Sequence, residues 1–222
     1  MDLQENGHER RQAQRRAEIL AAATALFFEK GYGRTSMDDV LNVIGGSKRT
    51  LYKHFKGKEE LFAAIVSNVS RRVLTRLEWK ETGDFRTNLQ AMGTRFLEAL
   101  YMPETLALYR AMVSEAAFFP ELAKTFFENG PMTGTRSLAK IFEAQNRLGK
   151  IVVREPDTAA RHFLGMLRAD NHLAALLTGR KFSTRQIREI VEKAVDTLME
   201  GAIEKVDQKK VSFERCQIDR RR

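Results

Sequence analysis

The chain has 222 residues, a formal net charge of +9 and 43% hydrophobic residues. It is therefore long enough for one or two folded domains, and its basic balance favours nucleic acid or an anionic membrane surface as a partner. One cysteine, Cys216, excludes an intrachain disulfide and a cysteine metal cluster, which fits a reducing compartment. The N-terminal sequence MDLQENGHERRQAQRR has no apolar run of the secretory type, and no stretch approaches the roughly 18 apolar residues of a membrane span. We expect a cytoplasmic protein without a membrane partner.

Glycines separate the first three predicted helices. Apolar residues repeat at helical spacing over residues 19–27, and glycines at positions 31 and 33 end that helix. Thr35 or Ser36 caps the second helix, whose first turn holds two aspartates, and Gly45–Gly46 break it. Ser47 then caps a third, short helix that ends at Gly57. The spacing predicts three compact helices at the start of an all-α protein.

The remaining pattern predicts longer helices, about ten in all. Their expected positions are 58–77, 84–100, 103–113, 120–126, 135–147, 156–177 and 183–205. The chain between the last three holds one apolar triplet, Ile151–Val153, which is too short to anchor a sheet. Residues 1–15 are expected to form a flexible basic arm, and residues 206–222 a disordered basic tail.

The stretch GGSKRTLYKHFKGKEEL, residues 45–61, joins the second and third helices through a tight turn, which is the sequence form of a helix-turn-helix. On a helical wheel Leu51 and Phe55 face the core. Three residues point away from the core: Arg49, Thr50 and Lys53. Three others lie at the edges of that face: Lys48, Tyr52 and His54. A solvated cationic face explains the charges equally simply. Three features together favour DNA binding: the capped helix before the turn, the glycines of the turn, and a third helix with only two core-facing residues opposite its basic face.

In a major groove such a helix presents donors to base edges and phosphates. Arg49 is the candidate for a base contact, because its fork can bind guanine O6 and N7 together. Phosphate contacts are expected from Lys48, Tyr52, Lys53, His54 and, at the start of the fourth helix, Lys58. Thr35 and Ser36 place hydroxyls and a helix N-terminus where a phosphate could dock.

Residues 18–62, EILAAATALFFEKGYGRTSMDDVLNVIGGSKRTLYKHFKGKEELF, closely resemble the DNA-binding domain of the TetR family of transcriptional regulators. The segments LFFEKGY, TSMDDV and SKRTLYKHFKGKEEL occur in the family's order and spacing. The resemblance implies a helix-turn-helix domain over residues 16–62 with Ser47–Phe55 as the recognition helix. It also implies DNA contacts from the positions matching Lys48, Arg49, Thr50, Tyr52, Lys53 and His54, and often from that of Lys58.

Three positions depart from the family pattern. The family usually has a small residue at Leu41, a valine at Gly46 that plugs the turn into the core, and often a glycine at Arg49. Gly46 cannot plug the turn, so we expect a looser or differently angled turn, or Leu41 filling the space instead. Arginine at position 49 is expected to alter the preferred DNA site.

Residues 63–205 are expected to form a larger C-terminal domain. YRAMVSEAAFFPELAKTFFENGP and ARHFLGMLRADNHLAALLTGR resemble the C-terminal domain of AefR-like regulators, which implies an all-helical ligand-sensing and dimerisation domain. Large apolar residues here either fill the core or line a cavity for a small, apolar or aromatic ligand. The candidate ligand-binding residues are Phe96, Met112, Phe126, Phe142, Phe163, Met166, Arg168 and His172.

Arg168 and His172 interrupt an apolar helix and lie one turn apart. They either orient a ligand, pair across a dimer interface, belong to a local network with Asp170 or are exposed to solvent. Apolar residues of the last two long helices either form a four-helix dimer interface or pack within one chain; they include Phe163, Leu167, Ala174, Leu177, Ile187, Ile190, Val191, Ala194, Val195, Leu198 and Ala202.

We therefore expect a homodimeric TetR-type repressor that binds a palindromic double-stranded DNA operator and is released by a small-molecule effector. The alternative is a ligand-independent, sequence-tolerant DNA-binding protein in chromosome organisation. The histidines are scattered without a nucleophile–base spacing, so no enzyme activity, cofactor or metal is expected.

Overall fold

The structure, a computed structural model, describes residues 3–201 of the chain. Over these residues the secondary structure is helical, which confirms the predicted all-α class. Its helices are α1 (Leu3–Lys30), α2 (Met37–Ile44), α3 (Lys48–His54), α4 (Lys58–Leu74), α5 (Phe85–Leu100), α6 (Pro103–Glu115), α7 (Pro120–Phe127), α8 (Thr133–Arg147), α9 (Pro156–Thr178) and α10 (Thr184–Gly201). In the described range, none of them is both long enough and apolar enough to cross a membrane. The tail predicted at residues 206–222 lies outside that range.

The chain divides into two compact units. The first runs through residue 72 and includes residues 102–131, and the second contains residues 73–101 and continues from residue 132. Helices α6 and α7 therefore pack with the N-terminal helices, although they come much later in the sequence. The domain boundary expected near residue 62 stays a prediction.

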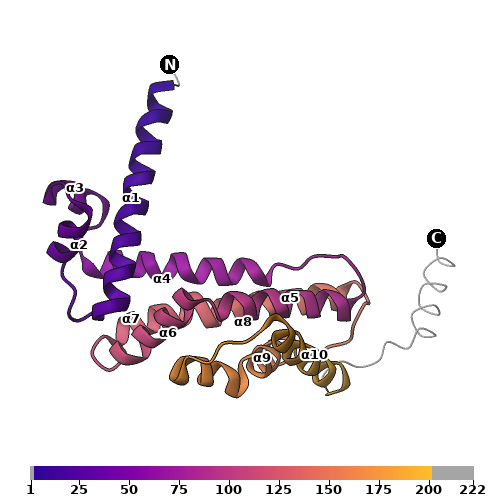
Figure 1. The fold of residues 1–222 in the computed structure, drawn as a ribbon. Coiled ribbons are helices and arrows are strands. Elements are labelled where there is room, and N and C mark those ends of the chain that lie inside the picture. The colour runs from indigo at the N-terminus through magenta and orange to yellow at the C-terminus, as the bar shows by residue number, and fades with distance from the viewer. Residues whose placement is uncertain (1–2, 202–222) are drawn as a thin grey trace. The chain divides into compact units, whose positions relative to one another are not determined.

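In the first unit, α2 and α3 lie beside α1, as Figure 1 shows. Leu51 and Phe55 of the third helix are 1% and 0% exposed, so both face the core as the wheel predicts. The aromatic rings of Phe27, Tyr32 and Phe62 pack against one another with centroids 5.0–5.5 Å apart. Such contacts hold short helices that would not be stable alone in water.

The first helix differs from expectation because it begins at Leu3 and continues through residues predicted to be a flexible arm. Arginine, glutamine and glutamate, which recur here, are all good helix formers. Helical structure fixes the direction in which the basic side chains of residues 10–16 point. Arg15 thereby reaches the turn between α2 and α3, and Arg16 reaches the ring of Phe55.

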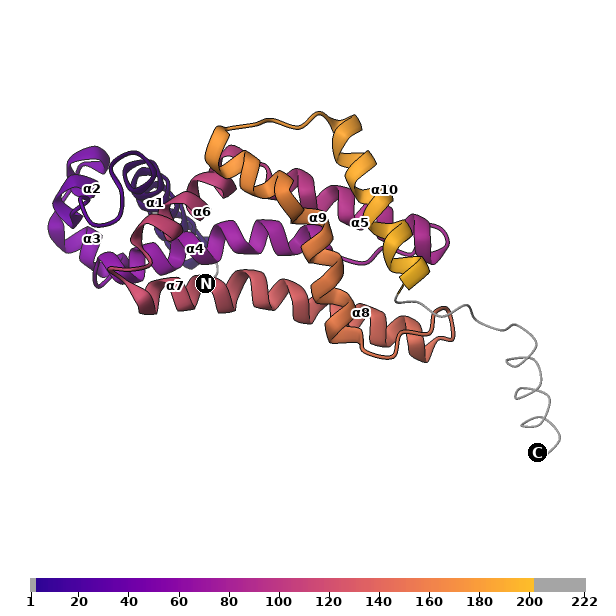
Figure 2. The same cartoon turned by 90° about the horizontal axis from the view of Figure 1, so that it is seen from below.

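Helices α5, α8, α9 and α10 build the second unit, in which α9 packs on both α8 and α10 (Figure 2). Gly93 of α5 allows Val191 of α10 to approach closely, because an added Cβ would lie 3.0 Å from the valine. An ion pair between Arg86 and Asp196 joins the same two helices. Close packing without a side chain at position 93 thus sets the spacing of this helix pair.

Two irregular turns interrupt the regular helices. Gly130 and Pro131 lie in a wide π turn, Glu128–Met132, that leads directly into α8. A π turn tolerates a proline because it does not use the regular hydrogen bond that proline cannot donate. In α9, Ala169 has φ 34° and ψ −145°, a strained conformation for a residue with a side chain.

Candidate nucleic-acid interface

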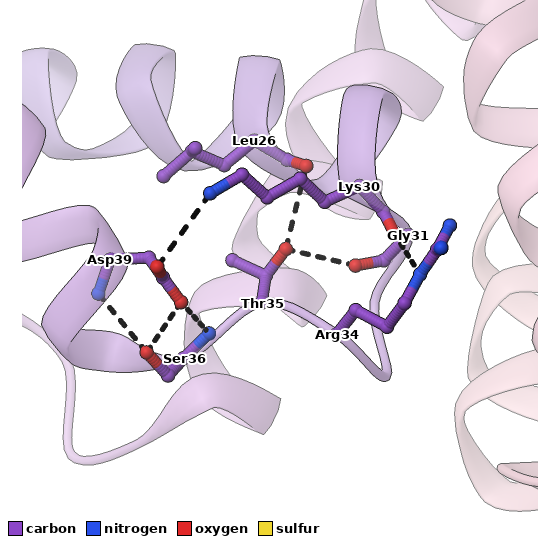
Figure 3. A network of polar contacts seen from close by, with 7 residues as sticks. All are labelled: Leu26, Lys30, Gly31, Arg34, Thr35, Ser36 and Asp39. Atoms are coloured by element: carbon purple, nitrogen blue, oxygen red, sulfur yellow. Dashed lines mark hydrogen bonds and ion pairs between the residues drawn. The ribbon is translucent and has the colours of Figure 1, made fainter.

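Thr35 lies in the turn between α1 and α2 and is only 2% exposed. Its hydroxyl donates to the carbonyl oxygen of Gly31 at 2.9 Å and lies 3.4 Å from that of Leu26, so it faces the end of α1 (Figure 3). The last carbonyls of a helix lack partners in the helix itself and are often satisfied in this way. The predicted phosphate contact of this hydroxyl therefore competes with a buried structural role.

Ser36 is the exposed N-cap of α2 and forms a capping box with Asp39. Its hydroxyl oxygen accepts from the Asp39 N–H at 3.1 Å, and its own N–H donates to the Asp39 carboxylate at 2.8 Å (Figure 3). The Ser36 hydroxyl and backbone bonds, followed by Lys30, hold the pKa of Asp39 below its usual range. The N-terminus of α2 is thus fixed by its own side chains.

The turn between α2 and α3 consists of Gly45 and Gly46, with φ of 64° and 96°. Arg15 of α1 reaches this turn: its Nη2 donates to the carbonyl oxygens of Ile44 at 3.2 Å and Gly45 at 2.6 Å. A Cβ at position 46 would lie 3.0 Å from the same Nη2. The space at the missing side chain is occupied by the guanidinium, while Leu41 is half-buried against the core.

Helix α3 is capped at its start and anchored at its end. Ser47 accepts from the Thr50 N–H at 3.2 Å, and the hydroxyls of the two residues lie 3.0 Å apart. At the C-terminal end the buried ring of Phe55 lies beneath the guanidinium of Arg16, 4.7 Å from its centre. Thr50, predicted to contact DNA, therefore also takes part in the N-cap of its own helix.

Arg49, Tyr52 and Lys53 are exposed on α3, opposite the anchored side. Lys48 is exposed too, and its ammonium pairs with Asp38 of α2 at 2.9 Å, which raises the pKa of the lysine. An exposed pair of this kind contributes little to stability and can be replaced by a stronger anion. The structure thus brings a base-reading candidate and several phosphate-binding candidates onto one seven-residue helix.

His54 is half-buried at the last position of α3. Desolvation lowers its pKa below 6.5, and the charges of Lys53, Arg16 and Arg15 lower it further. The ring is therefore neutral near pH 7. It can donate one N–H to DNA without adding a full charge.

Lys58, at the start of α4, is half-buried and points into the first unit. Its ammonium donates to the carbonyl oxygen of Tyr32 at 3.0 Å and lies 4.4 Å from the centre of the Tyr32 ring. Burial, followed by the nearby Glu59 and Glu115, raises the pKa of Tyr32 to about 12, so the ring stays neutral. The lysine predicted as a phosphate contact is held by the turn after α1.

The structure does not bring the predicted ligand-binding residues together in one compact unit. Met112 and Phe126 belong to the core of the first unit, whereas Phe96, Phe142, Phe163, Met166, Arg168 and His172 belong to the second. Phe142 and Phe163 are fully buried, and Arg168 donates to the carbonyl of Leu164 in its own helix. Burial, followed by the charge of Arg168, lowers the pKa of His172 to about 4.

A cavity of about 470 Å³ opens in the second unit between α9 and α10. Its lining combines Met166 with residues that are not among the predicted ligand-binding residues: Ala169, Asn171, Arg180, Phe182, Gln186, Glu189, Ile190, Lys193, Ala194 and Thr197. The Phe182 ring stacks on the Tyr101 ring with centroids 4.8 Å apart, and the guanidinium of Arg180 lies 4.9 Å from the Phe182 centroid. The volume of the cavity falls in the range of sites for small molecules.

Sequence reasoning also missed the contacts of Arg15 and Arg16. Both precede the first core residue, Ile19, by three or four positions, so one uninterrupted helix carries them. The signal available was that the basic run continues the helical register of α1 without a glycine or proline. Which turn the side chains reach depends on how α1 crosses α2 and α3.

The fold and this site define a helix-turn-helix DNA-binding protein with a second, all-helical unit. A family model described as bacterial regulatory proteins, tetR family, matches residues 19–65, and one described as the C-terminal domain of the AefR-like transcriptional repressor matches residues 87–201. A TetR-family transcriptional regulator from Mesorhizobium loti is 31% identical, with 86% of this chain and 97% of that one covered and a TM-score of 0.77. The chain belongs to the TetR family of transcriptional regulators, which are DNA-binding proteins rather than enzymes.

Two further similarities are informative. The solved structure of the flavonoid-responsive regulator FrrA is 27% identical, with 85% of this chain and 96% of that chain covered and a TM-score of 0.74. The transcriptional activator FasR of Mycolicibacterium smegmatis is 32% identical over 87 residues, which is 38% of this chain and 40% of FasR. The alignments with the first curated relatives span about 37–52% of those proteins.

Proposed function

We propose that this protein is a homodimeric repressor that binds a palindromic operator through α3 and leaves it when a small molecule binds the second unit. The observation that carries the proposal is the arrangement of α3. Two core residues, Leu51 and Phe55, anchor it, and a cationic face carrying Arg49 and Lys53 is left exposed. Repression rather than activation is supported by the repressor description of the family model over residues 87–201.

On the operator, Arg49 reads a base and its neighbours bind phosphates. Arg49 is exposed on α3, so its fork is available for guanine O6 and N7. Lys48 exchanges Asp38 for a phosphate, while Tyr52 and Lys53 contribute a hydroxyl and a second charge. His54, whose pKa is lowered by desolvation and by the neighbouring cations, donates one ring N–H to a phosphate.

Two copies are needed because one short recognition helix reads few base pairs. A two-fold dimer reads two half-sites separated by about 34 Å or a multiple of it. Most of the apolar stripe on α10, including Val191 and Leu198, is buried within the chain. Leu173 and Leu177 of α9 instead remain 56% and 76% exposed and lie one turn apart, which supports α9 as the dimer-forming helix.

The effector is expected to be a small aromatic molecule. The cavity between α9 and α10 has the aromatic ring of Phe182 in its wall for contact with an aromatic ligand, and Arg180 and Lys193 for acidic groups. FrrA is described as flavonoid-responsive, which supports flavonoids, with their aromatic rings and acidic phenols, as the first class to test on this chain. The predicted ligand residues Phe96, Phe142, Phe163, Arg168 and His172 are candidates to support the cavity wall.

Release of DNA requires the effector to favour one of two arrangements of the recognition helices, because a ligand that binds both equally shifts nothing. Contacts from the end of α6 and from Phe119, the residue before α7, to the turn after α1 provide a route within the first unit. Glu115 accepts from the Gly33 N–H at 3.2 Å, and Phe119 packs edge-on against Tyr32 at 4.7 Å. A shift of α6 would therefore be felt at the turn that precedes α2.

The first experiment is fluorescence anisotropy of the purified protein on the duplex upstream of its own gene, with a scrambled duplex as control. Both are measured at a stated, roughly physiological salt concentration. A preference of about a thousandfold establishes a site-specific regulator, and flavonoids are then titrated into the complex. Equal binding to duplexes from a genome-wide map and to the scrambled control would contradict the proposal in favour of a sequence-tolerant DNA-binding protein.

Dimerisation is checked by light scattering at micromolar concentration. Leu173→Glu and Leu177→Glu place charges on the exposed side of α9 and are expected to give monomers that keep their helical content. Glu200, which is already a charged, exposed residue of α10, provides a control through Glu200→Lys. A wild-type monomer would overturn the dimer model.

A further inference from the structure

The last backbone carbonyls of α2 need hydrogen-bond donors from outside the helix. The last carbonyls of a helix have no partner within it, and here the chain turns away immediately at two glycines with positive φ. The Gly45 N–H closes the helix by donating to the carbonyl of Leu41 at 2.9 Å. The carbonyls of Ile44 and Gly45 both accept from Arg15, about thirty residues earlier in the chain.

The guanidinium of Arg15 is held from two sides. Its Nη2 bridges the carbonyl oxygens of Ile44 and Gly45, and its Nη1 pairs with the Glu18 carboxylate at 2.9 Å. The planar fork of arginine permits this two-sided arrangement, which a single ammonium cannot reproduce. Because Gly46 has no Cβ, the guanidinium can approach the turn to a distance that a larger residue would obstruct.

Arg16, the next residue of α1, contacts the C-terminal end of α3. Arg16 lies over the ring of Phe55, which is the C-cap of α3 and is fully buried. Two consecutive residues of α1 therefore contact the turn before α3 and Phe55, the residue at the C-terminal end of α3. The axis of a seven-residue helix is defined by its two ends, and both ends meet α1.

We propose that Arg15 and Arg16 are positioning residues that fix the orientation of the recognition helix from α1, rather than direct contacts to DNA. The inference rests on the proposed operator binding, because it assigns the arginines a part in operator choice. Arg15 is the dominant member of the pair, because its contacts are short, charge-assisted hydrogen bonds. Without it the turn opens more often, and α3 samples angles at which Arg49 misses its base.

The neighbouring Arg11 provides a matched control. It lies one helical turn before Arg15 on α1, is exposed, and donates to the carbonyl of Gly7 in its own helix. Arg11→Ala removes the same charge and side chain from the same helix as Arg15→Ala. Arg15→Lys retains the charge and the helix-forming stem but lacks the fork, so it remains informative should the alanine variant fold poorly.

Hydrogen exchange of the free protein is the first test. Arg15→Ala and Arg15→Lys are expected to raise exchange at residues 45–52 by about tenfold, while the core of α4 and the second unit keep wild-type exchange. Arg11→Ala is expected to leave residues 45–52 unchanged. Unchanged exchange at these residues in Arg15→Ala would overturn the proposal whether or not an operator is known.

DNA binding distinguishes positioning from phosphate contact. On a duplex selected by the wild type from a random library, Arg15→Ala and Arg15→Lys are expected to bind about tenfold more weakly than Arg11→Ala, with little change on scrambled DNA. The salt slope of Arg15→Ala should equal that of Arg11→Ala. A slope lower by about 0.9, or recovery of full affinity by Arg15→Lys, would identify a phosphate contact and overturn the proposal.

Failure of the proposed function is seen separately. If the wild type itself shows no preference for any selected duplex, operator choice is absent and the proposed function fails. Increased exchange at residues 45–52 would then still establish that Arg15 holds the turn, whereas its part in operator choice would be refuted. A wild-type preference that Arg15→Ala retains in full refutes the positioning role alone.

Discussion

Replacing Thr35 by valine separates a structural hydroxyl from a DNA-binding one. The two side chains have nearly the same shape, so the substitution mainly removes the bond to the Gly31 carbonyl at 2.9 Å and the weaker contact to that of Leu26 at 3.4 Å. The site is 2% exposed, so water cannot replace the lost donor to Gly31. Leaving a buried carbonyl unsatisfied costs roughly 1–3 kcal/mol, and we expect a loss of about 1.5 kcal/mol in unfolding free energy.

The assay is urea unfolding followed by circular dichroism, with the fluorescence of Trp79, the single tryptophan, as a reference that reports the second unit. Thr24→Val is the control, because its hydroxyl donates to the carbonyl of Leu20 at 2.7 Å within α1. That carbonyl keeps its helical partner, so a change within about 0.5 kcal/mol is expected.

DNA affinity is measured for the same variants at a temperature where all are folded. Thr35→Val is expected to stay within about twofold of the wild type, because its hydroxyl faces α1 rather than the exposed surface. Unchanged stability combined with a clear loss of DNA affinity would refute the reasoning. The hydroxyl would then have to leave Gly31 and bind a phosphate in the complex.

Three other predictions concern charge. Asp38→Asn removes the partner of Lys48 and one negative charge near α3, so anisotropy should show tighter binding to any duplex and a salt slope steeper by up to about 0.9; weaker binding would mean that Asp38 orients the lysine usefully. His172 has a folded pKa of about 4 against 6.5, so the wild type loses stability as pH falls from 6.5 towards 4, by at most roughly 3.5 kcal/mol at about 1.4 kcal/mol per tenfold change in proton affinity. His172→Phe should flatten that part of the urea-derived stability profile, and an unaltered profile would show that another group titrates. Glu81 has its pKa lowered from 4.5 to about 2, first by Lys150 and then by Trp79 and Gln145, so its contribution is present above pH 4.5 and is lost as pH falls towards 2. Glu81→Gln should lower stability at pH 7, followed by Trp79 fluorescence, and equal stability of the two proteins at pH 7 would contradict this role.

Local features of the sequence determined the helices that carry the site. Ser36 and Ser47 cap α2 and α3 as their positions before helical patterns predict, because a cap bonds to amides within three residues of itself. Leu51 and Phe55 are buried because residues four apart share one face of a helix. The exposed cations of α3 follow from the same periodicity, since they occupy the remaining face.

Tertiary structure alone decided what several of the predicted DNA contacts bind in the free protein. Thr35 and Lys58 donate to carbonyls just after the end of α1, and Arg15, predicted within a flexible arm, binds the turn before α3. Likewise, Met112 and Phe126 entered the core of the first unit, although they lie in sequence within the expected ligand-binding domain. Periodicity and capping depend on residues a few positions apart, whereas these contacts join residues that the crossing of helices brings together.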